Sequence, residues 1–287
     1  MRVSRKTVLN KNSIKISWAG NETYIRDCTV VKRYIKSFDI EVEKAKQFEK
    51  ISFKNGFVFP QIVNVKEDEQ VIVYKYIENI KPIIGIYIDY LLGKLDDVYC
   101  FKVFQEIGRV LACIHRDLKL QSRVNSKWAI GNCNDVPSNV MSSFYKKNLR
   151  NTRKSFLHND FGFANIFFRK TDNNTIGIEF IVIDPSPNNY ISFNPEEYDS
   201  ILFDIASFVS CIDGRAPLKY YPILNWGKID KLKDSFLLGY EEESYFMINK
   251  EIVRDLSYLI SLLFFNKRYS GSNYKVKMAM GILYSKL

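Results

Sequence analysis

One stretch of the chain places three polar side chains between two apolar segments. In FLHNDFGFANIFFRK (Phe156–Lys170), His158, Asp160 and Asn165 stand between hydrophobic flanks. A short turn, TDNNTIG, and a second apolar run, IEFIVIDPSP, follow, and this run carries Asp184 at its end. Apolar runs rich in β-branched residues on both sides of a turn predict a hairpin of two strands. The hairpin would hold the polar loop at one of its ends.

Two carboxylates and one amide oxygen can converge at that end. Four residues separate Asp160 from Asn165, so a loop can present both side chains toward one point. The returning strand, Ile178–Ile183, would run back alongside and deliver Asp184. Mg²⁺ prefers such oxygen ligands, keeps few of them from the protein and takes the rest from water and phosphate. The pattern therefore predicts a magnesium site suited to nucleotide chemistry.

Composition limits the class of protein. The 287 residues are 46% hydrophobic and 26% charged, as in ordinary globular chains. No apolar run approaches the roughly 18–20 residues that span a bilayer, and the N-terminus lacks the apolar segment of a signal peptide. Five cysteines, an odd number without a CxxC pair, argue against a disulfide framework and a zinc site. We expect a cytoplasmic protein with reduced thiols and no transmembrane segment.

The net charge of +10 allows an anionic partner. General lysine enrichment and a dedicated anion-binding surface are both open explanations, and the scatter of the lysines favours the first. The densest cluster is YKKNLRNTRK (Tyr145–Lys154). No RNA-binding motif accompanies it, which disfavours nucleic acid. Peripheral contact with an anionic membrane surface stays open.

The first part of the chain has the pattern of strands with one helix. Ser13–Trp18 alternates, and Thr23–Ile35 is β-branched and aromatic. FVFPQIVNVKED and QVIVYKYIE predict two further strands on either side of a charged turn. After Thr23–Ile35 and before these two strands, residues 39–51 predict a helix whose buried face carries Phe48 and Glu41, while Glu43 points away. We expect a small, mostly β N-terminal lobe over residues 1–78.

The second part is predominantly helical. Residues 96–118 place apolar side chains at the i, i+3, i+4 spacing of a helix with a buried stripe. His115 is then a residue at the end of this helix. After the hairpin, residues 199–287 have the pattern of helices separated by loops. We expect a larger, mainly helical lobe over residues 79–287, so that the whole chain is bilobal and of the α+β class.

Five motifs of the chain, in their order along the sequence, resemble those of the protein-kinase-like superfamily. The resemblance is to its aminoglycoside phosphotransferase, choline kinase and fructosamine kinase branch. LHNDFGFANIFF followed by FIVIDPS resembles the catalytic loop and the metal-binding aspartate of these enzymes. FDIASFV resembles the start of a helix that follows, IGRVLACIH resembles a helix that precedes, and TVVKRY resembles the lysine-bearing strand. The match extends from about residue 29 to residue 209 and implies a bilobal kinase-like fold.

The resemblance implies roles for matching positions. Asp160 would orient the acceptor hydroxyl and take its proton, and Asn165 and Asp184 would hold Mg²⁺ across the phosphates of ATP. Lys32 would contact the α- and β-phosphates and pair with Glu41. Strand alternation lets either Lys32 or its neighbour Arg33 face the cleft, but not both.

Further positions complete the implied site. His158 and Asp204 would fix the catalytic loop by hydrogen bonds, and Asp204 can cap its helix as well. The hinge would offer backbone groups of Tyr74, Tyr76 and Ile77 to adenine. Gly20, in WAGNET, or the segment 9–12 (LNKN) would cover the phosphates, because the chain has no glycine-rich loop of the protein-kinase form.

The motifs lead us to expect an ATP- and Mg²⁺-dependent kinase acting on a small molecule. Nineteen residues between Asp184 and Asp204 are too few for a peptide-docking segment, which disfavours an atypical protein kinase. A basic chain fits an anionic acceptor better than a polycationic one. A hydroxyl of a sugar-containing metabolite or glycan is the favoured acceptor. A pseudokinase that binds nucleotide without turnover is the alternative.

Overall fold

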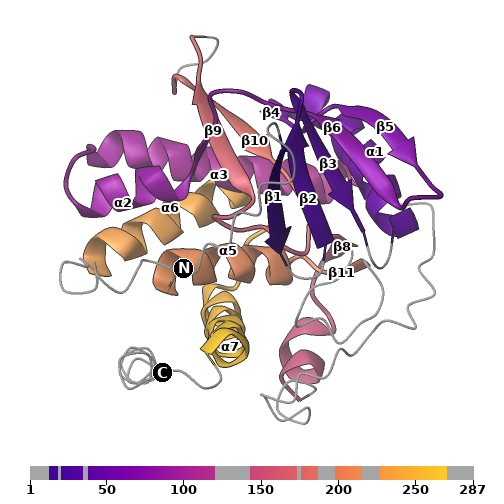
Figure 1. The fold of residues 1–287 in the computed structure, drawn as a ribbon. Coiled ribbons are helices and arrows are strands. Elements are labelled where there is room, and N and C mark those ends of the chain that lie inside the picture. Colours follow the sequence, from indigo (N-terminus) through magenta and orange to yellow (C-terminus); the bar gives the residue numbers. More distant parts are fainter. Residues whose placement is uncertain are drawn as a thin grey trace.

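A five-stranded antiparallel sheet forms most of the N-terminal part. The computed structural model describes residues 13–18, 21–34, 38–119, 143–172, 176–186, 198–214 and 226–269. The strands of this sheet lie in the order β1-β2-β3-β6-β5 (Figure 1). Their bounds are β1 Ser13–Trp18, β2 Asn21–Arg26, β3 Thr29–Arg33, β5 Ile62–Lys66 and β6 Val71–Lys75. Gly20 and the segment 9–12, both predicted to cover phosphates, lie outside the described residues.

The run Thr23–Ile35 is divided by a tight turn. Arg26 pairs with Thr29 across the hairpin of β2 and β3, and the two linking residues, Asp27 and Cys28, have φ of 46° and 57°. Positive φ at both central residues gives the backbone twist that two-residue hairpins favour. Glycine or asparagine usually signals such a turn, so the Asp-Cys pair did not lead us to predict a turn between β2 and β3.

A single long helix, α1 (Phe38–Asn55), accompanies this sheet. It ends four residues later than the apolar periodicity predicted, and Gly56, with a φ of 69°, follows it. Its buried face includes Phe48, whose ring centroid lies 5.5 Å from that of Phe59. Glu41 is buried on the same face and Glu43 is partly exposed, as the helical pattern predicted.

A second sheet of four strands adjoins the first, in the order β4-β10-β9-β7. The predicted hairpin is present, since β9 (Ile166–Lys170) and β10 (Ile178–Val182) pair antiparallel. The run FVFPQIVNVKED is divided: β4 (Phe57–Val58) pairs in parallel with β10 instead of continuing into β5. Pro60 lies between β4 and β5, and proline cannot donate to a strand ladder. The remaining strand is β7 (Lys81–Pro82), on β9.

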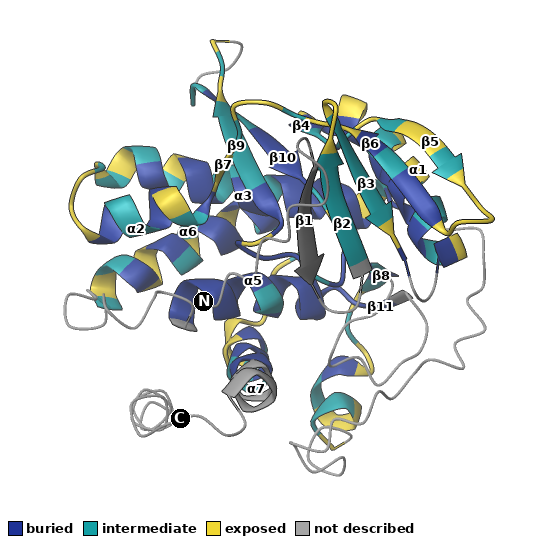
Figure 2. Ribbon diagram, in the orientation of Figure 1, coloured by how far each residue is buried: buried dark blue, intermediate teal, exposed yellow. Residues whose placement is uncertain are grey.

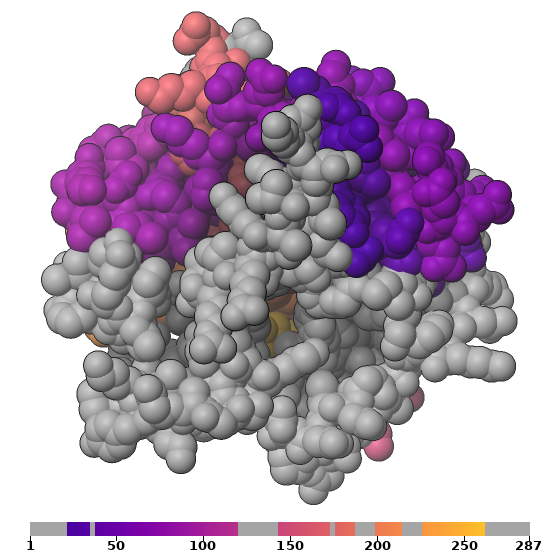
Figure 3. Space-filling model, in the orientation of Figure 1, coloured from indigo at the N-terminus to yellow at the C-terminus, as the bar shows by residue number. Residues whose placement is uncertain are grey.

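Helices make up most of the C-terminal part. They are α2 Ile84–Leu91, α3 Asp97–Asp117, α5 Leu202–Gly214, α6 Trp226–Ser244 and α7 Lys250–Tyr269, with one π-helical turn, η1 Tyr145–Leu149. A short antiparallel pair, β8 (Lys154–Phe156) and β11 (Tyr198–Ser200), leads into the polar loop and into α5. The buried sides of these helices face one another (Figure 2), and Figure 3 shows the N-terminal strands beside α2 and α3 on one face.

The boundaries of α3 agree with the predicted span. The side chain of Asp96 caps the helix by accepting the backbone N–H of Tyr99 at 2.8 Å, and Leu118 follows its last turn. None of the helices described in the structure is both long and apolar enough to cross a membrane.

Candidate active site

The loop between β8 and β9 brings Asp160 and Asn165 together, as predicted. The side-chain nitrogen of Asn165 donates to the backbone oxygen of Asp160 at 2.9 Å and to its carboxylate at 2.8 Å. Asn165 is 6% exposed and Asp160 partly exposed, so the amide is fixed while the carboxylate keeps access to solvent. Since the nitrogen is engaged, the amide oxygen is the atom of Asn165 left for other partners.

A neutral histidine holds this loop against the end of β10. Nε2 of His158 donates to the backbone oxygen of Ile183 at 3.1 Å, and Nδ1 accepts the N–H of Asp160 at 3.3 Å. Burial lowers the pKa of His158 to about 4, so the ring is uncharged at neutral pH. A carbonyl on one side and an N–H on the other require the tautomer with its proton on Nε2. Asp184 directly follows Ile183, so the histidine links the two predicted acidic positions.

Asp204 anchors the same loop from α5. Its carboxylate accepts the backbone N–H groups of His158 at 2.6 Å and Asn159 at 2.8 Å. A third hydrogen bond joins it to Nε2 of His115 at 3.1 Å, and Nδ1 of His115 meets the hydroxyl of Tyr240 at 2.8 Å. Burial favours the neutral acid, but these bonds prevail and the pKa of Asp204 is lowered. Asp204 is thus an ionised, fully buried anchor.

The roles of His115 and Tyr240 were missed by sequence reasoning. His115 is more than a histidine at a helix end, since it is buried and connects Asp204 to α6. Its position on the apolar stripe of α3 was the available signal, because a histidine on a buried face needs polar partners. Tyr240 gave no such signal, because tyrosine is common on buried faces.

Asp184 meets Lys32 across the two sheets. Nζ of Lys32, on β3, donates to Oδ1 of Asp184, although 152 residues separate the two in the chain. The side chain of Lys32 is 12% exposed and that of Asp184 is 43% exposed. Asp184 has a φ of 57°, a backbone conformation that non-glycine residues adopt at a cost and that is common at functional sites. Arg33, the alternative cation, is exposed, and its Nη1 lies 3.9 Å from Oε2 of Glu22.

Comparison with known proteins places this arrangement in a fold. No protein-family model matches the chain, and no curated protein matches its sequence. Among solved structures, aminoglycoside phosphotransferase APH(3'')-Id from Streptomyces rimosus matches with a TM-score of 0.51 and 10% identity, over 88% of this chain and 92% of that one. The chain has a protein-kinase-like fold. The predicted fold class, a mostly β N-lobe with one helix followed by a helical C-lobe, is confirmed.

Two further solved structures match over a similar extent. A choline/ethanolamine kinase family protein from Mesorhizobium loti gives a TM-score of 0.49 at 10% identity, over 96% of this chain and 88% of that one. Choline kinase LicA from Streptococcus pneumoniae gives 0.49 at 12%, over 97% and 92%.

Helix α1 of the N-lobe supplies a buried cation that sequence reasoning also missed. Lys44 is fully buried, and its Nζ donates to the backbone oxygen of Ser186. The same oxygen accepts the side-chain nitrogen of Asn159 at 3.2 Å, and the N–H of Ser186 donates to the oxygen of His158 at 2.8 Å. Residue 186 therefore joins α1, the loop of Asp160 and the segment after Asp184. The helical periodicity that identified Phe48 places Lys44 on the same face, so this signal was available.

Glu41, predicted to pair with Lys32, is buried at 5% exposure. It lies near two tyrosines. Burial foremost, then the neighbouring Tyr74 and Glu41, raise the pKa of Tyr34. Burial also raises the pKa of Tyr74, with a further contribution from Glu41, although the hydrogen bond with Tyr34 lowers it. Their hydroxyls are 3.4 Å apart, and the ring of Tyr34 lies 4.8 Å from Nζ of Lys32. The observed contacts of Lys32 are therefore with Asp184 and Tyr34. Pairing with Glu41 stays a prediction.

The predicted hinge follows β6. Tyr74 is buried on that strand, whereas Tyr76 is 37% exposed and donates its backbone N–H to the oxygen of Cys28 at 2.9 Å. Ile77 is partly exposed and continues toward β7 and the C-lobe. The structure thus places Tyr76 and Ile77 between β6 and β7, whereas the Tyr74 side chain is buried in the core. Their role as a hinge stays a prediction.

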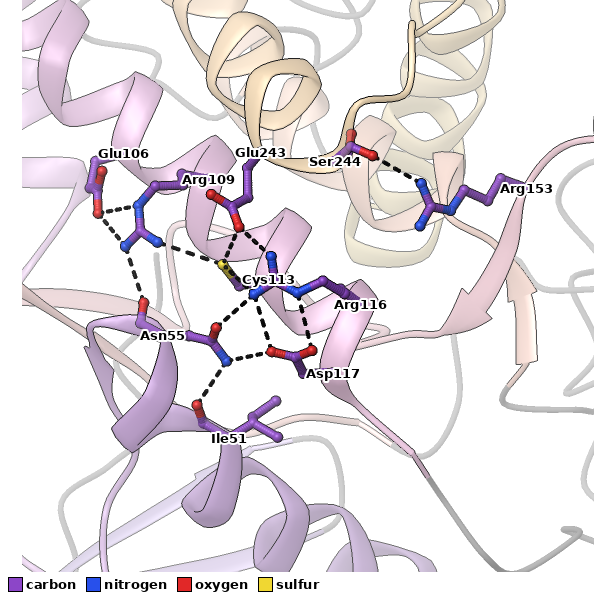
Figure 4. A network of polar contacts seen from close by, with 10 residues as sticks. All are labelled: Ile51, Asn55, Glu106, Arg109, Cys113, Arg116, Asp117, Arg153, Glu243 and Ser244. Atoms are coloured by element: carbon purple, nitrogen blue, oxygen red, sulfur yellow. Dashed lines mark hydrogen bonds and ion pairs between the residues drawn. The ribbon is translucent and has the colours of Figure 1, made fainter.

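A polar network ties the end of α1 to the C-lobe (Figure 4). The side chain of Asn55 donates to Asp117 at 3.0 Å and accepts from Arg116 at 2.9 Å, while its backbone oxygen accepts from Arg109 at 3.0 Å. Arg116 continues the network to Glu243 at the end of α6. The ring centroids of Phe48 and His158 lie 5.4 Å apart, edge to face. Helix α1 is therefore held to the C-lobe at two points, one of them at the loop of Asp160.

Proposed function

We propose that the chain is an ATP- and Mg²⁺-dependent phosphotransferase that moves the γ-phosphoryl group to a hydroxyl of a small molecule. One observation carries this proposal: in a kinase-like fold, Asp160 and Asn165 are hydrogen-bonded, and His158 links them to the segment bearing Asp184, which meets Lys32. Phosphoryl transfer through a loose transition state needs positioning and charge neutralisation, which this set of side chains can supply.

Each side chain has a role in this proposal. Asp160, partly exposed, accepts the proton of the acceptor hydroxyl. Asn165 through its amide oxygen and Asp184 through its carboxylate hold Mg²⁺, which neutralises charge on the phosphates. Lys32 then contacts the phosphates, and its present bond to Asp184 is exchanged for them. His158 and Asp204 are positioning residues that fix the loop.

The acceptor that we favour carries a sugar and is anionic or lies on an anionic surface. The net charge of +10 is complementary to such a molecule and not to a polycation. Cys28, Cys100 and Cys113 are free thiols, which fits the reducing cytoplasm that supplies ATP. The short segment between Asp184 and α5 favours a small or flexible acceptor over a folded protein.

Transfer from γ-labelled ATP to fractions of a host lysate tests the proposal. We expect the wild type to label a small-molecule or glycan fraction in the presence of Mg²⁺, and Asp160→Asn to lose at least about 100-fold in rate. Asp172→Asn removes an exposed carboxylate in the turn after β9 and serves as the matched control. Label in protein would indicate an atypical protein kinase. Bound nucleotide without any transfer would indicate a pseudokinase.

A further inference from the structure

A basic turn directly precedes the catalytic loop. Between Phe144 and Phe156 the sequence has five basic residues and no acidic one. Lys146, Lys147 and Arg150 lie in or beside η1, and all three are exposed. None of the three forms an ion pair with a residue that the structure describes. Their charge is therefore presented to the surroundings.

Arg153 connects this turn to an exposed apolar segment. Its guanidinium donates to the backbone oxygen of Ser244 at 3.2 Å (Figure 4) and lies 6.0 Å from the ring centroid of Phe246. The link between α6 and α7 that begins there exposes Tyr245 at 95% and Met247 at 80%. Two large apolar side chains are thus exposed in the segment that Arg153 contacts, and Figure 1 shows η1, in pink, and α7 on the same side of the molecule.

The nearby carboxylates are engaged elsewhere. Glu243 forms an ion pair with Arg116 of α3. Glu242 accepts from Gln105, also on α3, at 2.7 Å, and Glu241 accepts the backbone N–H of Ile248 at 2.7 Å. Because these three acids at the end of α6 bond to protein groups, they do not pair with the cations of η1.

Basic and apolar side chains exposed together fit the interface of an anionic bilayer. Lysine and arginine are attracted to acidic headgroups, while tyrosine and methionine can enter the boundary between headgroups and acyl chains. A dissolved phosphate or sugar phosphate would engage the cations and leave Tyr245 and Met247 without a partner. RNA would use the cations and could stack on Tyr245, but it offers Met247 no apolar environment.

We propose that Lys146, Lys147, Arg150, Arg153, Tyr245 and Met247 form a surface that docks the protein on anionic phospholipid bilayers. The basic residues of this basic–apolar surface lie in the chain immediately before the loop of Asp160. Docking through it would bring the candidate active site close to the membrane plane. Docking requires neither nucleotide nor phosphoryl transfer. Vesicle binding and phosphoryl transfer can therefore be tested independently of each other.

Sedimentation with vesicles tests the surface. Purified full-length protein is mixed with vesicles of phosphatidylcholine alone or of phosphatidylcholine with phosphatidylglycerol. We expect binding to the mixed vesicles only. Lys146→Gln with Lys147→Gln should weaken it roughly 30-fold, from about 1 kcal/mol for each basic residue near an anionic surface. Tyr245→Ser with Met247→Ser should also weaken it, and the loss should persist at high salt, because apolar insertion is not screened.

A matched pair of lysines provides the control. Lys46→Gln with Lys50→Gln removes two exposed charges from α1, away from the basic–apolar surface. Thermal unfolding of each variant confirms that the fold is retained. Equal weakening by the two lysine pairs would overturn the proposal, because attraction by net charge would then explain the binding. Failure of the mixed vesicles to bind, or their displacement by RNA of equal total charge, would overturn it as well.

Discussion

At the scale of single residues, the neutral state of His158 makes stability depend on pH. In the folded protein, burial lowers the pKa of His158 to about 4 from 6.5, the value for an exposed histidine. Between these values the unfolded chain binds a proton that the native ring does not, so this contribution is complete above 6.5 and is lost as pH falls toward 4. The full difference corresponds to about 3 kcal/mol.

We expect His158→Gln to flatten this dependence. Urea unfolding at several pH values across the window measures the free energy of unfolding of both proteins. Subtracting the two curves isolates His158 from carboxylates such as Asp204, whose pKa is also shifted and whose protonation also destabilises at low pH. If the free energies of unfolding of the two proteins changed equally with pH, His158 would be protonated in the native state as it is in the unfolded chain. The tautomer inferred from its contacts would then be wrong.

Lys44 gives a second prediction at this scale. Removing the donor of a buried hydrogen bond costs about 1–3 kcal/mol. We therefore expect Lys44→Met to lower the free energy of unfolding by about that amount and to stay folded. Ser186 would lose its bond to α1, so phosphoryl transfer should slow while the fold persists. Hydrogen exchange at Ser186 and Asn159 reports the loosening without an acceptor, and unchanged exchange would argue against the coupling.

Residues close in sequence were the predictable part of the site. The contact of Asp160 with Asn165 and the position of Asp184 after the hairpin were predictable, because a polar loop beside a hairpin joins residues that are close in sequence. The pairing of Lys32 with Asp184 spans 152 residues and depends on how the two sheets meet, which no local pattern encodes. The contact of His115 with Asp204 is of the same kind. The predicted catalytic and metal-binding roles await the transfer experiment.

At the scale of helices and strands, the closest packing in the described C-lobe is between α3 and α6. A Cβ on Gly239 would overlap the backbone oxygen of Gln105 and lie 2.6 Å from its carbonyl carbon. A Cβ on Gly108 would likewise fall on the backbone oxygen of Phe236. Backbone cannot yield as a side chain does, so we expect Gly239→Ala to lower the free energy of unfolding by about 3 kcal/mol or more.

Gly85→Ala provides the matched control in α2. Nothing lies within 4 Å of the added Cβ there, and alanine is the better helix former by about 1 kcal/mol. Denaturant titration should therefore show opposite signs for the two variants. Similar behaviour of both would mean that α3 and α6 are farther apart than described.

The junction of α1 with the C-lobe leads to a further prediction. Asn55 is 5% exposed and its amide bonds to Ile51, Arg116 and Asp117. Asn55→Ala would leave buried polar groups without a partner, at a cost of about 1–3 kcal/mol. Asn64→Ala, an exposed amide on β5, should change the free energy of unfolding by less than about 0.5 kcal/mol. Equal effects in denaturant titration would mean that the network does not stabilise the junction.

Elements were predicted where periodicity was long and misjudged where a turn was short. The stripe of α3 identified the helix nearly to its ends, and the hairpin of β9 and β10 was correct. The turn at Asp27 and Cys28 and the division at Pro60 were missed, because tertiary pairing overrode weak local signals there. The domain boundary near residue 78 stays a prediction.

At the scale of the whole molecule, nucleotide should stabilise the two lobes together. Lys32 lies on the N-lobe sheet and Asp184 follows the C-terminal hairpin, so a metal nucleotide bound by both would bridge them. A ligand that binds only the native state, at 100 times its Kd, stabilises it by about 2.7 kcal/mol. We expect a matching rise in the thermal midpoint with ATP and Mg²⁺, and a smaller one with ATP and EDTA.

Two variants divide this rise between the metal and the phosphates. Asp184→Asn removes a metal ligand, so the increment due to Mg²⁺ should vanish while some stabilisation by ATP remains. Lys32→Met should reduce the rise both with and without the metal, because the lysine contacts phosphate directly. Asp172→Asn should behave as the wild type, since its carboxylate is exposed and lies at the end of the hairpin of β9 and β10 that is opposite Asn165 and Asp184. Equal stabilisation of the wild type with Mg²⁺ and with EDTA would contradict the metal site, and the two lobes would then be bridged through Lys32 alone.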